Sequence, residues 1–353
     1  MKALVKYEKG EKKVRMMDCE EPHPAAGQVR IQVHYGGICG TDIHIYKDDG
    51  GYRTNPPVIL GHELSGVVDS VGEGGPSGLI GKRVVSETYY HTCGRCFFCR
   101  TGHPNLCPER LSIGSGVNGA FAPYVVVPER NLHILPDGVG LREAAMTEPL
   151  ACCAQAVLEK GEIRPGDRVL VTGPGAIGLM CLRLAVLCGG RVTVAGMKKD
   201  RERLQLALRF GAENIVYSDG ENVLERIRPI FGAYGADTVL ECSGANPAIN
   251  MALELVRKGG HYIQVGLTGR PTTLDMNLVT LKELRISGTF AQKPVWWARS
   301  LELLEQKKIS LDPLISGVMP LDRWQEAFEL YADGVGFKFL LSPIEGCSPP
   351  DES

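Results

Sequence analysis

Four cysteines, Cys93, Cys96, Cys99 and Cys107, stand close together in the stretch C-G-R-C-F-F-C-R-T-G-H-P-N-L-C. The short C-x-x-C spacings bring neighbouring sulfurs close enough to share one tetrahedral Zn²⁺ at roughly 2.3 Å each. Four thiolates leave no open coordination position, so we expect this zinc to be structural and to fold a lobe of the chain. A disulfide knot is the alternative, but twelve cysteines without the apolar core of a secretory leader favour a reducing compartment.

Three other pieces of the chain offer residues that suit a second metal ion. Cys39 stands on an expected turn after a strand, in G-I-C-G-T-D-I-H, and His62 and Glu63 stand together in G-H-E. Glu148 precedes a proline and a leucine. A thiolate, an imidazole and a carboxylate form a donor set that can bind zinc and leave one position open. Singly, each has an ordinary alternative, because a lone cysteine is more often a small buried residue and a lone histidine a surface one.

The run Gly173-Pro174-Gly175-Ala176-Ile177-Gly178 has the G-x-G-x-x-G pattern of a dinucleotide site. It follows an expected strand directly and begins an expected helix, which is the context that gives the pattern its meaning. Gly173 permits the tight turn, Gly175 lets a pyrophosphate approach the backbone, and Gly178 allows the helix to lie close on the sheet. The amides and the positive dipole end of that helix would then hold the phosphates.

The end of the next strand decides between NAD and NADP. An NAD site usually has an Asp or Glu there, about 20 residues past the glycines, to bind the ribose hydroxyls. Gly196 occupies that place, and Lys198, Lys199 and Arg201 lie within reach of a 2′-phosphate. These residues favour NADP. The alternative is that they are solvated charges at a helix start and that Asp200 binds the ribose.

Hydrophobic patterning predicts the elements that must position these residues. Up to about residue 150, short β-type runs cut by Gly and Pro indicate a compact β-rich domain that carries the zinc lobe. From residue 168 onward strands and helices alternate, which predicts an α/β doubly wound parallel sheet with helices on both faces. The expected strands are 29–35, 64–71, 83–86, 124–127, 169–172, 192–194, 238–240, 262–265 and 284–286, with helices at 148–160, 176–188, 204–210, 297–308 and 321–333 and a last apolar run at 338–341.

The composition excludes some classes of partner. A chain of 353 residues suits two domains, and its 44% hydrophobic and 23% charged residues are typical of a soluble globular protein. A formal net charge of −2 gives no electrostatic footprint for nucleic acid. No window approaches the roughly 20 apolar residues of a membrane span. We therefore expect a cytoplasmic protein that binds neither nucleic acid nor a membrane.

The motifs follow one another in a fixed order: G-I-C-G-T-D-I-H, G-H-E, C-x2-C-x2-C-x7-C, E-P-L and G-P-G-A-I-G. In this order and with similar gaps they resemble the zinc-dependent medium-chain dehydrogenase/reductase family, over residues 2–343. The resemblance implies a Rossmann domain, a GroES-like catalytic domain with a structural zinc lobe, and two zinc ions per chain. Cys39, His62 and Glu148 would then be ligands of the catalytic zinc, and Glu63 a direct or intermittent ligand.

Within that family the chain looks like the sorbitol and other polyol dehydrogenases, because Glu148 stands where liver-type alcohol dehydrogenases have a cysteine. Cys152 and Cys153 are expected to be core residues. The stretches G-T-D-I-H-I-Y-K and G-V-N-G-A-F-A-P-Y also look like threonine dehydrogenases. We expect NAD(P)-dependent hydride transfer at the secondary hydroxyl of a polyol, sugar or sugar acid. The alternatives are L-threonine or another secondary alcohol, a zinc-free quinone reductase, and a non-enzymatic zinc and nucleotide-binding scaffold.

The expected catalytic residues are Thr41, His44 and Glu63. Zinc would lower the pKa of the substrate hydroxyl, and Thr41 would pass its proton through the cofactor ribose toward His44, because an unperturbed histidine titrates near pH 6.5. The resemblance also suggests Lys338 as a partner of the pyrophosphate, and the backbone of Val265, Gly266 and Leu267 beside the carboxamide. Candidates for a substrate pocket are Tyr46, Tyr52, Phe121 and Trp297.

These expectations divide the chain into four segments. Residues 1–150 form the first part of the catalytic domain, with the zinc lobe at 91–110, and residues 151–287 form the dinucleotide domain. Residues 288–345 return to the catalytic domain, and residues 346–353 form a disordered tail. The resemblance also implies a homodimer or homotetramer, since the zinc lobe often lies near a subunit contact.

Overall fold

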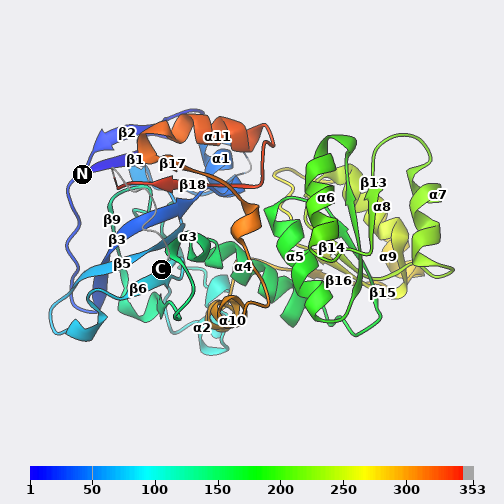
Figure 1. Ribbon diagram of the computed structural model, residues 1–353, viewed down its shortest axis with the longest axis horizontal. Coiled ribbons are helices and arrows are strands. Elements are labelled where there is room, and N and C mark those ends of the chain that lie inside the picture. Colours follow the sequence, from blue (N-terminus) through cyan, green and yellow to red (C-terminus); the bar gives the residue numbers. More distant parts are fainter. Residues whose placement is uncertain (50, 345–353) are drawn as a thin grey trace. The chain divides into compact units, whose positions relative to one another are not determined.

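The structure of the protein is a computed structural model that describes residues 1–49 and 51–344 (Figure 1). The expected tail at 346–353 lies outside the described residues. The chain divides into two compact units, Met1–Pro149 together with the chain from Gln292 on, and Leu150–Ala291. Within the described residues, no helix is long and apolar enough to cross a membrane.

The first unit is rich in β-structure. Its strands are β1 (Lys2–Lys6), β2 (Val14–Asp18), β3 (Gln28–Gly37), β4 (Val58–Ile59), β5 (Glu63–Val71), β6 (Arg83–Ser86), β7 (Tyr89–His91), β8 (Leu111–Ser112), β9 (Tyr124–Pro128), β10 (Leu132–Ile134), β17 (Ile315–Pro320) and β18 (Lys338–Ser342). A seven-stranded sheet has the order β10-β6-β5-β3-β18-β17, with β9 also paired to β3. The late strand β18 lies antiparallel against β3, so the end of the chain completes a sheet begun near its start.

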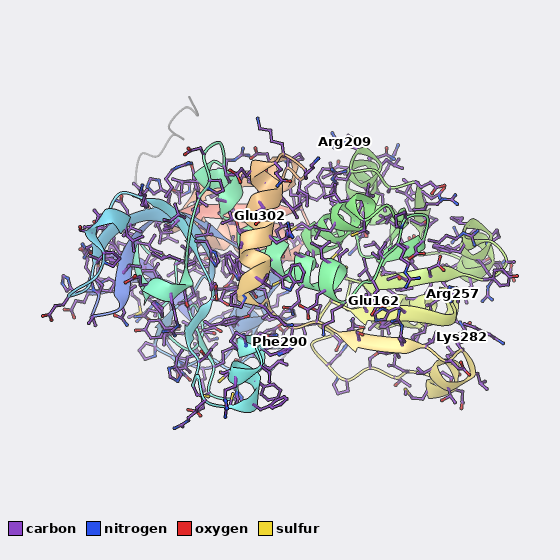
Figure 2. All side chains as sticks on the ribbon, turned by 90° about the horizontal axis from the view of Figure 1, so that it is seen from below. Glu162, Arg209, Arg257, Lys282, Phe290 and Glu302 are labelled. Carbon is purple, nitrogen blue, oxygen red and sulfur yellow. The ribbon has the colours of Figure 1, made fainter. Side chains whose placement is uncertain are left out.

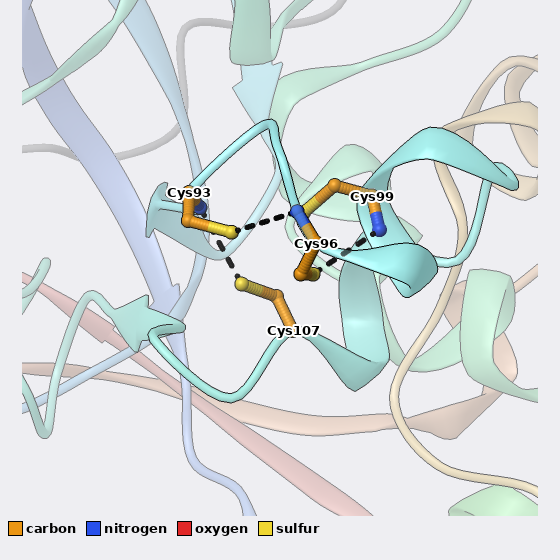
Figure 3. Close-up of side chains that lie close together, drawn as sticks. All are labelled: Cys93, Cys96, Cys99 and Cys107. Carbon is orange, nitrogen blue, oxygen red and sulfur yellow. Dashed lines mark hydrogen bonds between the residues drawn. The ribbon is translucent and has the colours of Figure 1, made fainter.

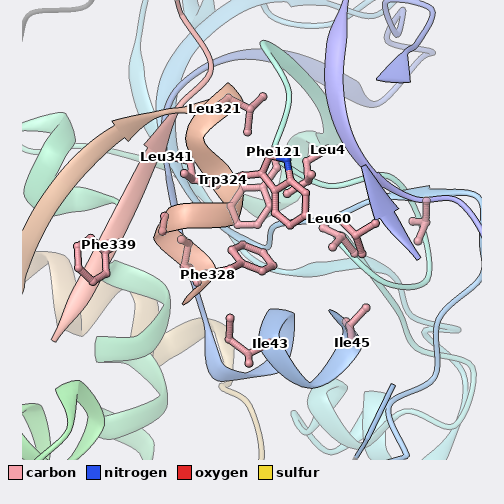
Figure 4. Close-up of a cluster of buried hydrophobic side chains, with 14 residues drawn as sticks. Leu4, Ile43, Ile45, Leu60, Phe121, Leu321, Trp324, Phe328, Phe339 and Leu341 are labelled. Carbon is pink, nitrogen blue, oxygen red and sulfur yellow. The ribbon is translucent and has the colours of Figure 1, made fainter. Parts of the chain in front are cut away.

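The helices of this unit are short. They are α1 (Gly40–Lys47), α2 (Phe97–Arg100), α3 (Leu141–Ala144), α10 (Pro294–Glu305) and α11 (Trp324–Ala332). Ile43 and Ile45 of α1 belong to one buried cluster with Trp324 and Phe328 of α11 (Figure 4). An isolated helix of this length is marginal in water, so tertiary packing stabilises α1 and thereby fixes Cys39, which precedes it.

Of the four aromatic residues expected at a substrate pocket, Phe121 and Trp297 are buried in the core, and Tyr46 is partly buried against it. Tyr46 packs edge-on against Trp324 at 5.8 Å, and Phe121 is fully buried in the same cluster. Trp297 is buried and stacks on His133 at 5.7 Å. Large aromatic rings bury much apolar area, which explains their place in the interior.

The second unit is a six-stranded parallel sheet with helices, as the alternating pattern predicted. Its strands are β11 (Arg168–Thr172), β12 (Arg191–Gly196), β13 (Asn214–Tyr217), β14 (Ala236–Glu241), β15 (Val256–Gln264) and β16 (Arg285–Gly288). Its helices are α5 (Ala176–Leu187), α6 (Arg201–Arg209), α7 (Val223–Ile227), α8 (Asn246–Leu255) and α9 (Met276–Leu281). Helix α4 (Thr147–Ala154) leads into the unit. The strand order is β13-β12-β11-β14-β15-β16, the order of a dinucleotide-binding Rossmann sheet. Right-handed crossovers place α5 and α6 on one face and α8 and α9 on the other. The predicted fold class is therefore confirmed, although β13 was not among the expected strands.

Side chains anchor α8 at its C-terminal end. Lys282 Nζ donates hydrogen bonds to the carbonyl oxygens of Leu253 and Glu254, at 2.8 Å each. Arg257 Nε, in the strand that follows, donates to Asp237 Oδ1 at 2.6 Å. Figure 2 labels Lys282 and Arg257. Because the last carbonyls of a helix have no partner inside the helix, the Lys282 ammonium stabilises this end of α8.

Candidate metal and dinucleotide sites

The four lobe cysteines converge (Figure 3). Their sulfur atoms lie within 4.8 Å of one another, and none is in a disulfide. The amide of Cys96 donates to Cys93 Sγ at 3.3 Å, and the amide of Cys93 donates to Cys107 Sγ at 3.4 Å. The amides of Arg95 and Cys96 lower the pKa of the Cys93 thiol to about 7. A closed set of four sulfurs with a stabilised thiolate fits a structural zinc ion.

A second group of metal-ligating atoms lies in the same unit. Donor atoms of Cys39, His62 and Glu63 lie within 4.8 Å of one another. Cys39 lies two residues after the end of β3, and Glu63 begins β5. These two strands are paired, with Gly37 opposite Glu63. A Cβ atom at Gly37 would lie 2.1 Å from Glu63 Oε2, so only glycine leaves room for this carboxylate. The sheet thus brings together residues from the two separate motifs.

Negative charge surrounds His62. Burial alone would lower the pKa of His62, but Cys39, Asp42 and Glu148 outweigh it and raise the pKa well above its usual value. Asp42 Oδ2 accepts a hydrogen bond from the Cys39 amide at 2.9 Å, while Asp42 Oδ1 lies 3.8 Å from His62 Nδ1.

Within the described chain, Asp42 Oδ1 and Glu63 Oε2 are buried without a hydrogen-bond partner. Buried acceptors are normally satisfied, and a cation at this cluster would satisfy Glu63 Oε2. Asp42 was not among the expected site residues. Its place three residues after Cys39, where its carboxylate can cap the start of α1, is the signal that could have identified it.

Glu148 lies beside this group but outside it. Its Oε1 accepts a hydrogen bond from Gln292 Nε2 at 3.0 Å. Burial raises the pKa of Glu148, and the charge of Glu63 acts in the same direction, whereas His62 opposes it. Glu148 therefore shares the electrostatic environment of the cluster. Of the neighbouring cysteines, Cys153 is buried and its thiol donates to the Ile177 carbonyl oxygen at 3.5 Å, which is a core position.

The ammonium group of Lys338 is buried and paired with a carboxylate of the metal cluster. Its Nζ lies 2.6 Å from Glu63 Oε1 and 2.8 Å from the Ile38 carbonyl oxygen, and both charged side chains are almost fully buried. Burial would lower the pKa of Lys338, but Glu63 and Tyr331 outweigh it and raise the pKa. The role at the cofactor pyrophosphate that the resemblance implied for Lys338 stays a prediction. In the described structure the buried ammonium holds a carboxylate of the metal cluster.

His44 lies in helix α1. Thr41 and His44 are three residues apart in α1 and so lie on one face. His44 Nδ1 lies 2.5 Å from Asp49 Oδ1. The imidazole ring stacks on the ring of Tyr52, with 5.3 Å between the ring centroids. Burial raises the pKa of Tyr52, and the Thr41 hydroxyl beside it acts in the opposite direction. These four side chains form a connected polar group, of which Asp49 was not expected.

The glycine motif has the geometry that its pattern requires. Gly173 has φ +83°, a left-handed conformation that favours glycine. A Cβ atom at Gly178 would lie 1.9 Å from the Gly173 carbonyl oxygen, which would force the helix away from the turn. Gly175, in contrast, precedes α5 and has no atom within 4 Å of its would-be Cβ, so this space is free for a ligand. The site fits a pyrophosphate at the start of a twelve-residue helix.

The end of β12 carries no carboxylate, and none could be added without a shift. A Cβ atom at Gly196 would lie 2.7 Å from Pro174 Cγ of the glycine motif. Asp200 Oδ2 accepts a hydrogen bond from the Met197 amide at 2.9 Å, and Asp200 Oδ1 lies 3.7 Å from Arg203. Its carboxylate therefore already has partners. Lys198, Lys199 and Arg201 are exposed here, and so are Met197 and Glu202.

The segment expected beside the carboxamide follows β15. The amides of Val265 and Gly266 both donate to the Glu241 carbonyl oxygen at 2.8 Å, and Leu267 is exposed. This segment therefore lies at the carboxyl edge of the parallel sheet, the same edge as the glycine motif.

Comparison with known proteins places these sites in context. Residues 25–137 match the family model of the alcohol dehydrogenase GroES-like domain, and residues 176–306 match that of the zinc-binding dehydrogenases. The chain is 41% identical to sorbitol dehydrogenase of Halalkalibacterium halodurans, covering 98% of this chain and 100% of that protein. It is 40% identical to D-arabitol-phosphate dehydrogenase of Enterococcus avium, covering 97% of each. A crystal structure of a zinc-binding dehydrogenase from Sinorhizobium meliloti bound to NADP superposes with a TM-score of 0.88 at 30% identity, covering 97% of this chain and 99% of that one.

Proposed function

The chain belongs to the zinc-containing medium-chain alcohol dehydrogenase family and is a zinc-dependent NAD(P) dehydrogenase of alcohols and polyols, and on this premise we propose that it oxidises a secondary hydroxyl of a polyol, sugar or sugar acid. The observation that carries the proposal is the convergence of Cys39, His62 and Glu63 within 4.8 Å. The glycine motif in its strand and helix context adds the dinucleotide site. Two relatives named for the oxidation of polyols or their phosphates support the substrate class.

We assign Cys39, His62 and Glu63, whose donor atoms converge, as ligands of a catalytic zinc ion. We assign Glu148 as a further ligand, because its charge acts on His62. When bound, this zinc supplies a Lewis acid that makes a substrate hydroxyl more acidic, and the nicotinamide ring supplies the hydride acceptor. Asp42 faces Nδ1 of His62 and so orients the imidazole with Nε2 toward the cluster. Lys338 holds Glu63 beside the same cluster through their 2.6 Å contact.

A proton must leave the substrate hydroxyl as the carbonyl forms. We assign Thr41 to hydrogen-bond that hydroxyl and His44 to deliver the proton to solvent, since about a third of the His44 side chain is exposed, at 35%. Asp49 accepts the hydrogen bond of His44 Nδ1 and therefore leaves Nε2 to receive the proton. Tyr52, which contacts both Thr41 and His44, keeps the two side chains in place.

We propose NADP as the favoured cofactor. Gly196 offers no carboxylate to a ribose, and Pro174 fills the space where one would stand. The exposed Lys198, Lys199 and Arg201 supply the positive charge that attracts a 2′-phosphate. Asp200 is engaged with the Met197 amide and Arg203, which leaves it poorly placed to bind the ribose.

The test is a panel of initial rates with the purified protein. A polyol, a hexonate, a polyol phosphate and L-threonine are each assayed with NAD⁺ and with NADP⁺, and Cys39→Ala serves as the inactive control. We expect kcat/KM for one of the first three substrates to exceed that for L-threonine by about tenfold or more, because polar sites discriminate strongly by hydroxyl contacts. L-Threonine as the best substrate would contradict the assignment. Bound zinc and dinucleotide without turnover of any alcohol would indicate a scaffold.

A further inference from the structure

A buried carboxylate lies where the strand order of the parallel sheet changes direction. Glu241 is the last residue of β14 and is fully buried. It stands opposite Thr172, the last residue of β11, in the pairing of the two strands. In the sheet, β12 and β13 lie on one side of β11, and β14, β15 and β16 lie on the other. In open parallel sheets, ligands bind outside the carboxyl ends of the strands at this position.

Every partner of the Glu241 carboxylate is a hydrogen-bond donor. Oε1 accepts from Thr172 Oγ1 at 3.0 Å, from the Ser243 amide at 2.9 Å and from the Ser243 hydroxyl. Oε2 accepts from the Gly244 amide at 3.0 Å and from Gln264 Nε2 at 2.7 Å. The two backbone amides can only donate, one to each oxygen, so a side chain that accepts at both oxygens fits this arrangement.

These contacts join three loops. Thr172 leads into the glycine motif after β11, Ser243 and Gly244 follow β14, and Gln264 ends β15. Gln264 Nε2 also donates to the Gly266 carbonyl oxygen at 2.7 Å, so the carboxylate is linked to the segment after β15 as well.

The same loops are packed without room for side chains. A Cβ atom at Gly244 would lie 2.2 Å from the Leu267 carbonyl oxygen. A Cβ atom at Gly173 would lie 2.8 Å from Ser243 Cβ. A change at the centre of the three loops must therefore move the loops themselves.

We propose that Glu241 is a positioning residue of the dinucleotide site, whose carboxylate holds the loops after β11, β14 and β15 in the shape that receives the cofactor. The proposal rests on the proposed cofactor site, because the glycine motif and Val265–Leu267 are its expected contacts. Glu241 touches no ligand itself, since protein donors occupy both of its oxygens. A glutamine of the same size would turn an NH₂ group toward another donor, and a loop must shift to relieve that conflict.

The test compares Glu241→Gln with Glu213→Gln, an exposed carboxylate of the same unit that pairs with Arg191 at 2.6 Å. Dissociation constants for NADH and NADPH are measured by fluorescence titration, and cofactor KM and kcat by initial rates, on protein with its zinc content determined. We expect Glu241→Gln to raise the cofactor dissociation constants and the cofactor KM about tenfold or more, because an unpaired buried donor is costly. The cofactor KM should change more than kcat. Ser243→Ala, which removes one hydroxyl donor, should act in the same direction to a smaller extent. Glu213→Gln should match the native protein.

A lower melting temperature with an unchanged dissociation constant would make Glu241 a purely structural residue and overturn the proposal. If Glu241→Gln does not fold, the double variant Thr172→Val and Ser243→Ala is judged by the same criteria. Gly175→Ala tests the cofactor site separately. Native binding in Gly175→Ala would disprove the site itself, whereas weak binding in Gly175→Ala with native binding in Glu241→Gln would disprove only the role of Glu241.

Discussion

Replacing Gly175 by alanine should weaken dinucleotide binding without harming the fold. Gly175 has φ −73° and ψ −179°, a conformation that any residue adopts. No protein atom lies within 4 Å of the position that a Cβ atom would take, so the added methyl group meets nothing in the free protein. In the complex the methyl group would stand where the pyrophosphate approaches the helix. Overpacking by a methyl group costs about 1–3 kcal/mol, which corresponds to roughly 5- to 150-fold in affinity.

The assay is a fluorescence titration of NADH and NADPH, with a thermal melt of each variant. Gly78→Ala is the control, because its Cβ position is equally open but lies in the other unit. Gly178→Ala provides the contrast: its Cβ would lie 1.9 Å from the Gly173 carbonyl oxygen, so stability and binding should fall together. The reasoning is refuted if Gly175→Ala melts like the native protein and also binds both dinucleotides with native affinity, because the motif would then be an ordinary glycine-rich turn.

Three further changes test other parts of the account. Cys93→Ser should lower the melting temperature and remove about one zinc equivalent per chain, because a structural metal site contributes its binding free energy to folding; a variant with native zinc content and stability would contradict the closed four-cysteine site. Changing Lys198, Lys199 and Arg201 together to alanine should raise the KM for NADP⁺ several-fold and leave the KM for NAD⁺ nearly unchanged. If the native protein prefers NAD⁺ to NADP⁺, the basic residues do not select the cofactor. His44→Ala should lower kcat by a factor on the order of 10² and retain some activity, since water can replace a proton relay; a native rate would show that His44 takes no part.

The alternating half of the fold could be predicted from the sequence because its signals are local. The apolar run 169–172, the glycines and the helical run 176–188 follow one another without a gap, and β11 and α5 have nearly these bounds. The metal-ligating residues were identifiable because C-x-x-C spacing and the order of the motifs are specific to zinc proteins. The edge strand β13 was not predicted because its four residues are only half-buried and show no clear alternation of apolar and polar side chains.

Contacts between distant parts of the chain could not be predicted. Helix α1 contains Thr41, Ile43 and Ile45, whose β-branched side chains disfavour a helix, and packing against α11 overrides that preference. Lys338 and Glu63 are 275 residues apart in the chain, so no local pattern shows that they form a buried pair. The closeness of His44 to Asp49 likewise depends on the end of α1, because no helix was expected there.

The most direct test of the catalytic zinc is a metal analysis of Cys39→Ala and His62→Ala beside the native protein. The account predicts two zinc ions per chain in the native protein and about one in each variant, with no alcohol oxidation but with dinucleotide binding largely retained, since the glycine motif belongs to the other unit. The lobe cysteines would hold the remaining ion. If Cys39→Ala keeps both equivalents of zinc and oxidises alcohols at a near-native rate, Cys39 is a packing residue and the catalytic zinc site is wrong.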